Sequence, residues 1–177
     1  MSDNMELFKA IKNRRSIRKY KDDTVEHELI EKVVEAGIWA PSAGDLQSWD
    51  AVVVKDEKTK FKITAAAYFQ DFVLKAPVLI AVCANKANAG ARYGDRGRDL
   101  YCIQDASCAA LNMMLRAYDL GLGSAWVGAF KEEEVSEALI LPAHIRPVAL
   151  IPIGYPDEEV DAPSRRSIEK VIHKEKY

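Results

Sequence analysis

The stretch that most constrains the fold is residues 76–84, Ala-Pro-Val-Leu-Ile-Ala-Val-Cys-Ala. It is an uninterrupted apolar run, far shorter than the roughly 20 residues that a membrane-spanning helix needs. Its β-branched centre, Val78–Cys83, predicts a strand buried on both faces in the middle of a sheet. We therefore expect a buried central strand here and no membrane segment.

Composition agrees with a folded domain of ordinary size. The 177 residues are 49% hydrophobic and 29% charged, with 25 Lys and Arg against 27 Asp and Glu. A net charge of −2 argues against binding to nucleic acid or to an acidic membrane surface, although a small anion could still bind a local basic cluster. We expect one domain over residues 1–177.

Helical periodicity appears on both sides of the central strand. Residues 101–120 predict the longest helix, whose apolar stripe is rich in small residues and indicates close approach of another helix or of a backbone segment. Residues 5–13 and 25–38 predict two further helices, the second with Thr24 as its N-cap. Further strands are expected at residues 51–54, 124–130 and 147–153, followed by a long tail, residues 155–177.

Cysteine and histidine usage excludes two classes of site. Three cysteines with no C-x-x-C spacing argue for reduced thiols in the cytoplasm, and the N-terminal residues show no secretory signal. The three histidines are scattered without metal-ligand spacing, so no metal site is predicted.

The basic stretch Lys12–Lys21 contains six Lys or Arg residues and no acid. Such a stretch suits a solvated helix end, where cations complement the helix dipole. It also suits a phosphate site, because arginines bind phosphate oxygens with two parallel hydrogen bonds and Ser16 adds a hydroxyl.

Two glycine-containing segments are open to a similar choice. Residues 40–49, Ala-Pro-Ser-Ala-Gly-Asp-Leu-Gln-Ser-Trp, form either a plain helix-to-strand loop or a loop that a ligand approaches closely. In residues 120–130, Gly128-Ala129 within an expected strand marks a bulge or a flat ligand lying against the backbone. The Arg92–Arg98 stretch is expected as an exposed loop, with a substrate lid as the alternative.

In this order the motifs resemble the FMN-dependent nitroreductase family. The segments that carry the resemblance are residues 14–20 (R-R-S-I-R-K-Y), 40–49, 121–130 and 151–156 (I-P-I-G-Y-P). The resemblance implies an α+β fold with a mixed, largely antiparallel sheet flanked by helices. It also implies an intertwined homodimer with FMN at the interface, in which tail 155–177 crosses to the partner.

Residue roles follow from the same resemblance. Around the phosphate and ribityl chain it places Arg14, Arg15, Ser16, Arg18, Arg165 and Arg166, with Arg18 also near flavin N1/O2. Beside the ring it places Pro41, Ser42, Ala43, Gly44, Gln47, Gln70, Trp126, Val127, Gly128 and Ala129, with the backbone of Gly128 and Ala129 near N5/O4. Asp45 and Ser48 stand where the family usually has Asn and Pro, and Pro163 where it often has a second basic phosphate ligand.

The activity that the resemblance implies is NAD(P)H oxidation. NADH or NADPH would pass a hydride to flavin N5, and a nitroaromatic, quinone or similar small acceptor would then be reduced in ping-pong turnover. Such a mechanism requires no catalytic side chain. The alternatives are a non-catalytic protein that binds or stores flavin, and a relative that fragments flavin or removes halogens.

Overall fold

The computed structural model describes residues 6–177. Its sheet has four strands in the order β1-β2-β4-β3, and every adjacent pair is antiparallel. The strands are β1 (Trp49–Val54), β2 (Val78–Asn85), β3 (Gly123–Ser124) and β4 (Ile145–Gly154). Within the described chain, the parallel contact is the isolated bridge between Ser16 and Ser124. The predicted central strand is therefore confirmed as β2, with β1 and β4 on its two sides.

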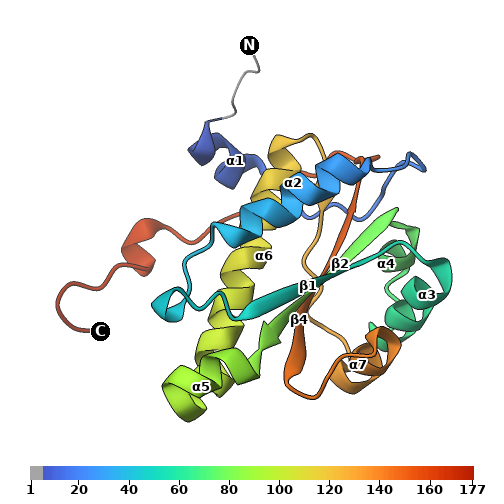
Figure 1. Ribbon diagram of the computed structural model, residues 1–177. Coiled ribbons are helices and arrows are strands. Elements are labelled where there is room, and N and C mark those ends of the chain that lie inside the picture. Colours follow the sequence, from blue (N-terminus) through green and yellow to red (C-terminus); the bar gives the residue numbers. More distant parts are fainter. Residues whose placement is uncertain (1–5) are drawn as a thin grey trace.

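Helices cover both faces of this sheet (Figure 1). One layer contains α2 (His27–Ile38) and α6 (Cys102–Asp119), and their buried residues join Val78, Ile80 and Val82 in one core. Because successive strand residues face opposite sides, Leu79, Ala81 and Cys83 lie in a second core with the other layer. The continuous apolar sequence of β2 follows from this double burial.

The second layer consists of α3 (Glu57–Ala66), α4 (Asp71–Lys75) and α7 (Glu132–Leu139). In Figure 1 these three helices lie together, across the sheet from α2 and α6. The predicted fold class, α+β with a largely antiparallel sheet flanked by helices, is confirmed.

Two elements extend the first layer. α1 (Leu7–Asn13) agrees with the helix predicted at 5–13, of which Met5 lies outside the described residues. α5 (Lys86–Arg96) kinks at Gly94 and leads through a π-helical turn, Gly97–Tyr101, into α6. The Arg92–Arg98 stretch is thus helical, and its prediction as an exposed loop was wrong.

Two further local predictions were wrong. α2 begins at His27 with Glu26 as its N-cap, so Thr24 caps nothing, and Val25, buried in the core, lies before the helix. The expected strand at 124–130 is strand only over Gly123–Ser124. Beyond Ser124 the chain stays at the sheet edge through the Val127–Leu150 bridge, with Trp126 and Gly128 exposed.

After β4 the chain first lies against residues 18–21, where the Lys21 amide donates to the Tyr155 carbonyl and the Asp157 amide donates to the Lys19 carbonyl. The tail then leaves the body of the molecule. Residues 161–177 are exposed throughout, and Figure 1 shows this end reaching away from the sheet. No helix in the described part of the chain is long and apolar enough to cross a membrane.

Candidate anion and cofactor site

The basic segment 14–18 runs directly out of α1 and lies along β3. The amide of Ile17 donates to the Ser124 carbonyl at 3.0 Å, and Ser16 forms the parallel bridge with Ser124. This pairing fixes the backbone of the segment, because a bridged strand edge leaves little freedom in φ and ψ.

The arginines of segment 14–18 and Arg165 of the tail meet in one cavity. A hollow of about 280 Å³ is lined by Arg14, Arg15, Ser16 and Arg18 and by the tail residues Val160, Asp161, Pro163 and Arg165. Burial lowers the pKa of Arg14 below its usual value, and the positive charges of Arg15 and Arg165 lower it further. Clustered cations that repel one another are stabilised when an anion binds among them.

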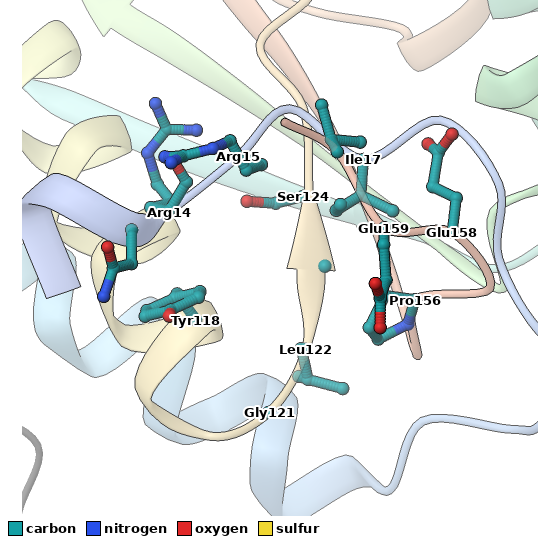
Figure 2. Close-up of a pocket in the computed structure, with 13 residues that line it drawn as sticks. Arg14, Arg15, Ile17, Tyr118, Gly121, Leu122, Ser124, Pro156, Glu158 and Glu159 are labelled. Atoms are coloured by element: carbon teal, nitrogen blue, oxygen red, sulfur yellow. The ribbon is translucent and has the colours of Figure 1, made fainter. Parts of the chain in front are cut away.

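Three buried polar atoms here have no hydrogen-bond partner: Arg14 Nη1, Arg15 Nε and Ser124 Oγ. Arg14, Arg15 and Ser124 also line an adjoining cavity of about 540 Å³ (Figure 2). In this view the Ser124 hydroxyl points to the side on which the two arginines lie. Buried polar groups without partners are costly, so three donors of this kind fit an oxygen-rich anion such as a phosphate. Sequence reasoning missed Ser124, whose place beside the arginines depends on strand pairing.

A second group of predicted residues gathers beyond β3. The Gln70 amide, at the N-cap of α4, donates to Ala129 O at 3.2 Å and to Ala67 O at 2.9 Å. Gly128 and Ala129 are exposed, and Val127 exchanges two backbone hydrogen bonds with Leu150.

Arg18 links this second group to the arginine cavity. Its guanidinium lies over the Phe72 ring of α4, 5.6 Å from the ring centroid. Sequence reasoning did not identify Phe72. Within one chain, a continuous region therefore extends along β3 and α4. It consists of residues 14–18, Arg165, Gln70 and 126–129.

The loop at 41–47 is not part of this region. It packs on the beginning of α6, where Asp105 accepts the amide of Ala43 at 3.0 Å. Tyr118, near the other end of α6, lines the cavity that contains Arg14 and Arg15. At 1.5 Å per residue, the thirteen residues from Asp105 to Tyr118 span about 20 Å. Within one chain the loop therefore lies far from the arginines, and it belongs to the helical layer across the sheet from Gln70.

Arg166 is also outside the cavity. Its side chain donates to the carbonyl of Lys170 in the exposed tail, whereas Arg165 lines the cavity.

The fold is that of an α+β protein with an arginine-lined cavity beside a sheet edge. Comparison with known proteins identifies its family. The model of the nitroreductase family matches residues 11–68 and 61–155. A protein of Methanothermobacter thermautotrophicus, provisionally named an NADH dehydrogenase/NAD(P)H nitroreductase, is 37% identical over 158 residues, covering 87% of this chain and 79% of that protein.

Two further proteins are similar along almost the whole chain. An FMN reductase (NAD(P)H) of Bacillus subtilis is 30% identical, covering 97% of this chain and 74% of the relative. The NADPH:FMN oxidoreductase of Vibrio harveyi, solved in complex with NAD+, superposes with a TM-score of 0.89 at 25% identity, covering 97% of this chain and 77% of that one. The chain belongs to the nitroreductase family.

Proposed function

We propose that the protein is an FMN-dependent NAD(P)H oxidoreductase that reduces nitroaromatics, quinones or similar small acceptors. The observation that carries the proposal is the convergence of Arg14, Arg15 and Arg165 on one cavity with unpartnered buried donors. Relatives named as FMN reductase and NADPH:FMN oxidoreductase support the choice of FMN as the anion. Bound FMN would supply the redox chemistry, accepting a hydride from NADH or NADPH and passing electrons to the acceptor.

The residues around the cavity would bind and orient the cofactor. Arg14, Arg15, Arg165 and the Ser124 hydroxyl would hold the phosphate dianion through charge-assisted hydrogen bonds. Arg18, supported by the Phe72 ring, would supply positive charge at the N1/O2 edge of the flavin. The exposed backbone at Gly128 and Ala129 would face N5 and O4, leaving the other face of the ring open to substrate.

We also propose that the site is completed in a homodimer. The loop at 41–47 lies too far from the arginines of its own chain to share their ligand, so a second copy would provide it. On α1, Leu7 and Phe8 are each 68% exposed, and Trp39 after α2 is 80% exposed. An apolar surface of this kind fits a partner subunit. The first part of tail 155–177 stays on its own chain, with Arg165 in the arginine cavity, and the part beyond Arg165 would cross to that subunit.

The cysteines fit a reducing compartment. Cys83, Cys102 and Cys108 are all unpaired, and burial raises the pKa of the Cys83 thiol to about 12, so this thiol stays protonated near neutral pH. We therefore place the enzyme in the cytoplasm.

The first test is the visible spectrum of the purified protein before and after anaerobic addition of NADH or NADPH. We expect flavin bands that bleach with reductant and return with a quinone. A protein without flavin bands after incubation with FMN would contradict the proposal. Bound FMN without steady NAD(P)H consumption would instead indicate a flavin-storage protein.

The second test targets the arginine cavity. Replacing Arg14→Ala together with Arg165→Ala removes two of the cations, so we expect largely FMN-free protein and at least about a hundredfold weaker FMN binding, at about 1.4 kcal/mol or more per lost contact. Riboflavin, which lacks the phosphate, should bind the double variant almost as tightly as it binds the wild type. Arg96→Ala with Arg146→Ala removes two arginines outside the cavity and serves as the control. Undiminished FMN content in the first double variant would refute the phosphate assignment.

A further inference from the structure

The loop that packs on the beginning of α6 has an unusual backbone between Ser42 and Ser48, and we call this part loop 42–48. Gly44, Asp45 and Gln47 all have positive φ, at 58°, 55° and 48°. For Asp and Gln this left-handed region costs free energy, about 1 kcal/mol or more per residue. Such a conformation persists only where the surrounding structure fixes it, so the contacts that hold this loop are informative.

Asp105 of α6 holds the loop at both ends. One carboxylate oxygen accepts the amide of Ala43 at 3.0 Å, and the other accepts the amide of Ser48 at 3.4 Å. The side chain is only 3% exposed, and none of the ion pairs among residues 6–177 includes it. The two loop amides are therefore the groups that the structure provides to this buried carboxylate.

The backbone amide of Ser48 makes the second of these contacts. A proline at this position would have no amide hydrogen to donate and could not make it. Ser48 is fully buried, which fixes the loop where it enters β1.

Helix α5 holds the middle of the same loop. Asn88 donates to the Leu46 carbonyl at 2.8 Å, and Arg92 donates to the Gly44 carbonyl at 3.2 Å. A side chain at Gly44 would overlap the Tyr93 hydroxyl, so α5 also limits what can stand there. Asp105, Asn88 and Arg92 thus bind the loop backbone at four points; we call these three residues the loop clamp.

We infer that the loop clamp, with Asp105 at its centre, positions loop 42–48 against the ring of a flavin bound by a second copy of the chain. This inference rests on the proposed function. Asp105 is a positioning residue, because it touches the loop backbone and not the ligand. The alternative is that Asp105 only stabilises the fold, in which case changing it would lower the melting temperature and leave the flavin environment of the folded protein unchanged.

The experiment compares Asp105→Asn with Asp119→Asn, the same substitution at the far end of α6, where Asp119 pairs with Arg116. The side chain of the Asp105→Asn variant keeps one acceptor oxygen. Its NH2 group faces the other loop amide and cannot accept a hydrogen bond from it. Flavin-free protein is titrated with FMN and with riboflavin, below the melting temperature of each variant. We expect Asp105→Asn to weaken both ligands by about tenfold, the equivalent of one lost charge-assisted hydrogen bond, and Asp119→Asn to change neither.

The ratio of the two affinities identifies the part of the flavin that is affected. Loss at the ring lowers FMN and riboflavin affinity equally, whereas loss at the phosphate lowers only FMN affinity. At saturation, the absorption bands of flavin bound to Asp105→Asn should also shift toward those of free flavin. If wild-type and Asp105→Asn proteins bind both ligands equally well with identical spectra, the inference is wrong although the proposed function stands. If the wild type binds no flavin, both fail.

A milder variant covers the case in which Asp105→Asn does not fold. Arg92 is exposed, so Arg92→Met should fold normally while losing the hydrogen bond to Gly44. We expect it to weaken FMN and riboflavin by a common factor of about three, the low end for a neutral acceptor. Unchanged affinity for both ligands in Arg92→Met would overturn the inference without reference to Asp105.

Discussion

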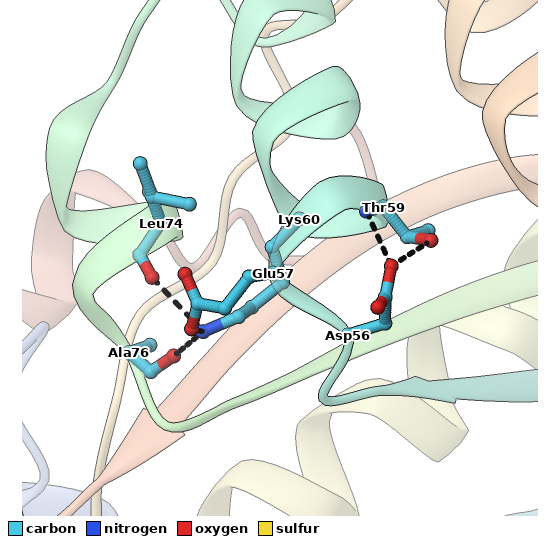
Figure 3. A network of polar contacts seen from close by, with 6 residues as sticks. All are labelled: Asp56, Glu57, Thr59, Lys60, Leu74 and Ala76. Atoms are coloured by element: carbon cyan, nitrogen blue, oxygen red, sulfur yellow. Dashed lines mark hydrogen bonds and ion pairs between the residues drawn. The ribbon is translucent and has the colours of Figure 1, made fainter.

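At the scale of single residues, the least expected side chain in the core is Lys60 of α3. It is 3% exposed, and its ammonium donates to the carbonyls of Leu74 and Ala76 at 3.1 and 3.0 Å and pairs with Glu57 at 2.9 Å (Figure 3). The last carbonyls of a helix have no partners inside it. Lys60 provides hydrogen-bond donors for the carbonyls at the end of α4, and so joins α3 to α4.

We predict that Lys60→Met lowers the free energy of unfolding by about 2 kcal/mol. Methionine fills a similar volume but leaves two carbonyls without a donor, and the gain from not burying a charge offsets only part of that loss. Urea unfolding followed by circular dichroism measures the change. Lys58→Met, on the exposed face of the same helix, should stay within about 0.5 kcal/mol of the wild type. Equal stabilities of the two variants would show that the carbonyl contacts contribute nothing.

At the scale of elements, the sequence predicted the packing of α6 better than the edge of the sheet. Its small-residue stripe indicated close approach of another element, and the structure places α2 there. Gly37 of α2 is the tightest point, since an added Cβ would lie 2.5 Å from Met113 Cε and 3.0 Å from the Trp49 ring.

We predict that two substitutions at Gly37 change the stability of the protein by different amounts. Gly37→Ala gains up to about 1 kcal/mol of helix propensity, and the flexible end of Met113 can move, so stability should change little. Gly37→Leu must displace the Trp49 ring as well, so it should cost about 3 kcal/mol through overpacking. Thermal unfolding of the two variants tests this difference. A leucine variant as stable as the alanine variant would mean that α2 and α6 are less tightly packed than these distances indicate.

The sheet edge was harder to predict for a physical reason. Residues 124–130 carry β-forming side chains, and Val127 is buried between exposed neighbours as in a strand. Strand pairing, however, depends on a partner distant in sequence. In the segment 123–130, only Gly123 and Ser124 pair with β4 as a ladder. Similarly, the sequence identified Arg14 and Arg165 as basic, but not Ser124 or Asp105, whose importance depends on which segments the fold brings together.

At the scale of the whole molecule, the proposed homodimer would combine the arginines of one subunit with the loop of the other in each FMN site. This proposal predicts complementation between damaged subunits. One subunit carries Arg14→Ala and Arg165→Ala, with an intact loop. The other carries Gly44→Val, whose side chain would overlap Tyr93 at a backbone φ of 58° and so distort the loop, while its arginines remain. Each variant alone should contain little FMN.

When equal amounts of the two variants are unfolded together and refolded, about half of the dimers formed by random association contain one subunit of each kind. In such a dimer one site has both damaged parts and the other has both intact parts, so about a quarter of all sites should bind FMN. Absorbance of the bound flavin measures this fraction, and mass spectrometry of intact dimers counts the mixed species. A control mixture of Arg14→Ala and Arg165→Ala single variants, both damaged on the arginine side, should recover no intact site. Mixed dimers that form yet bind no more FMN than their parents would show that each chain builds its site alone, because only a site shared between subunits can be restored by mixing.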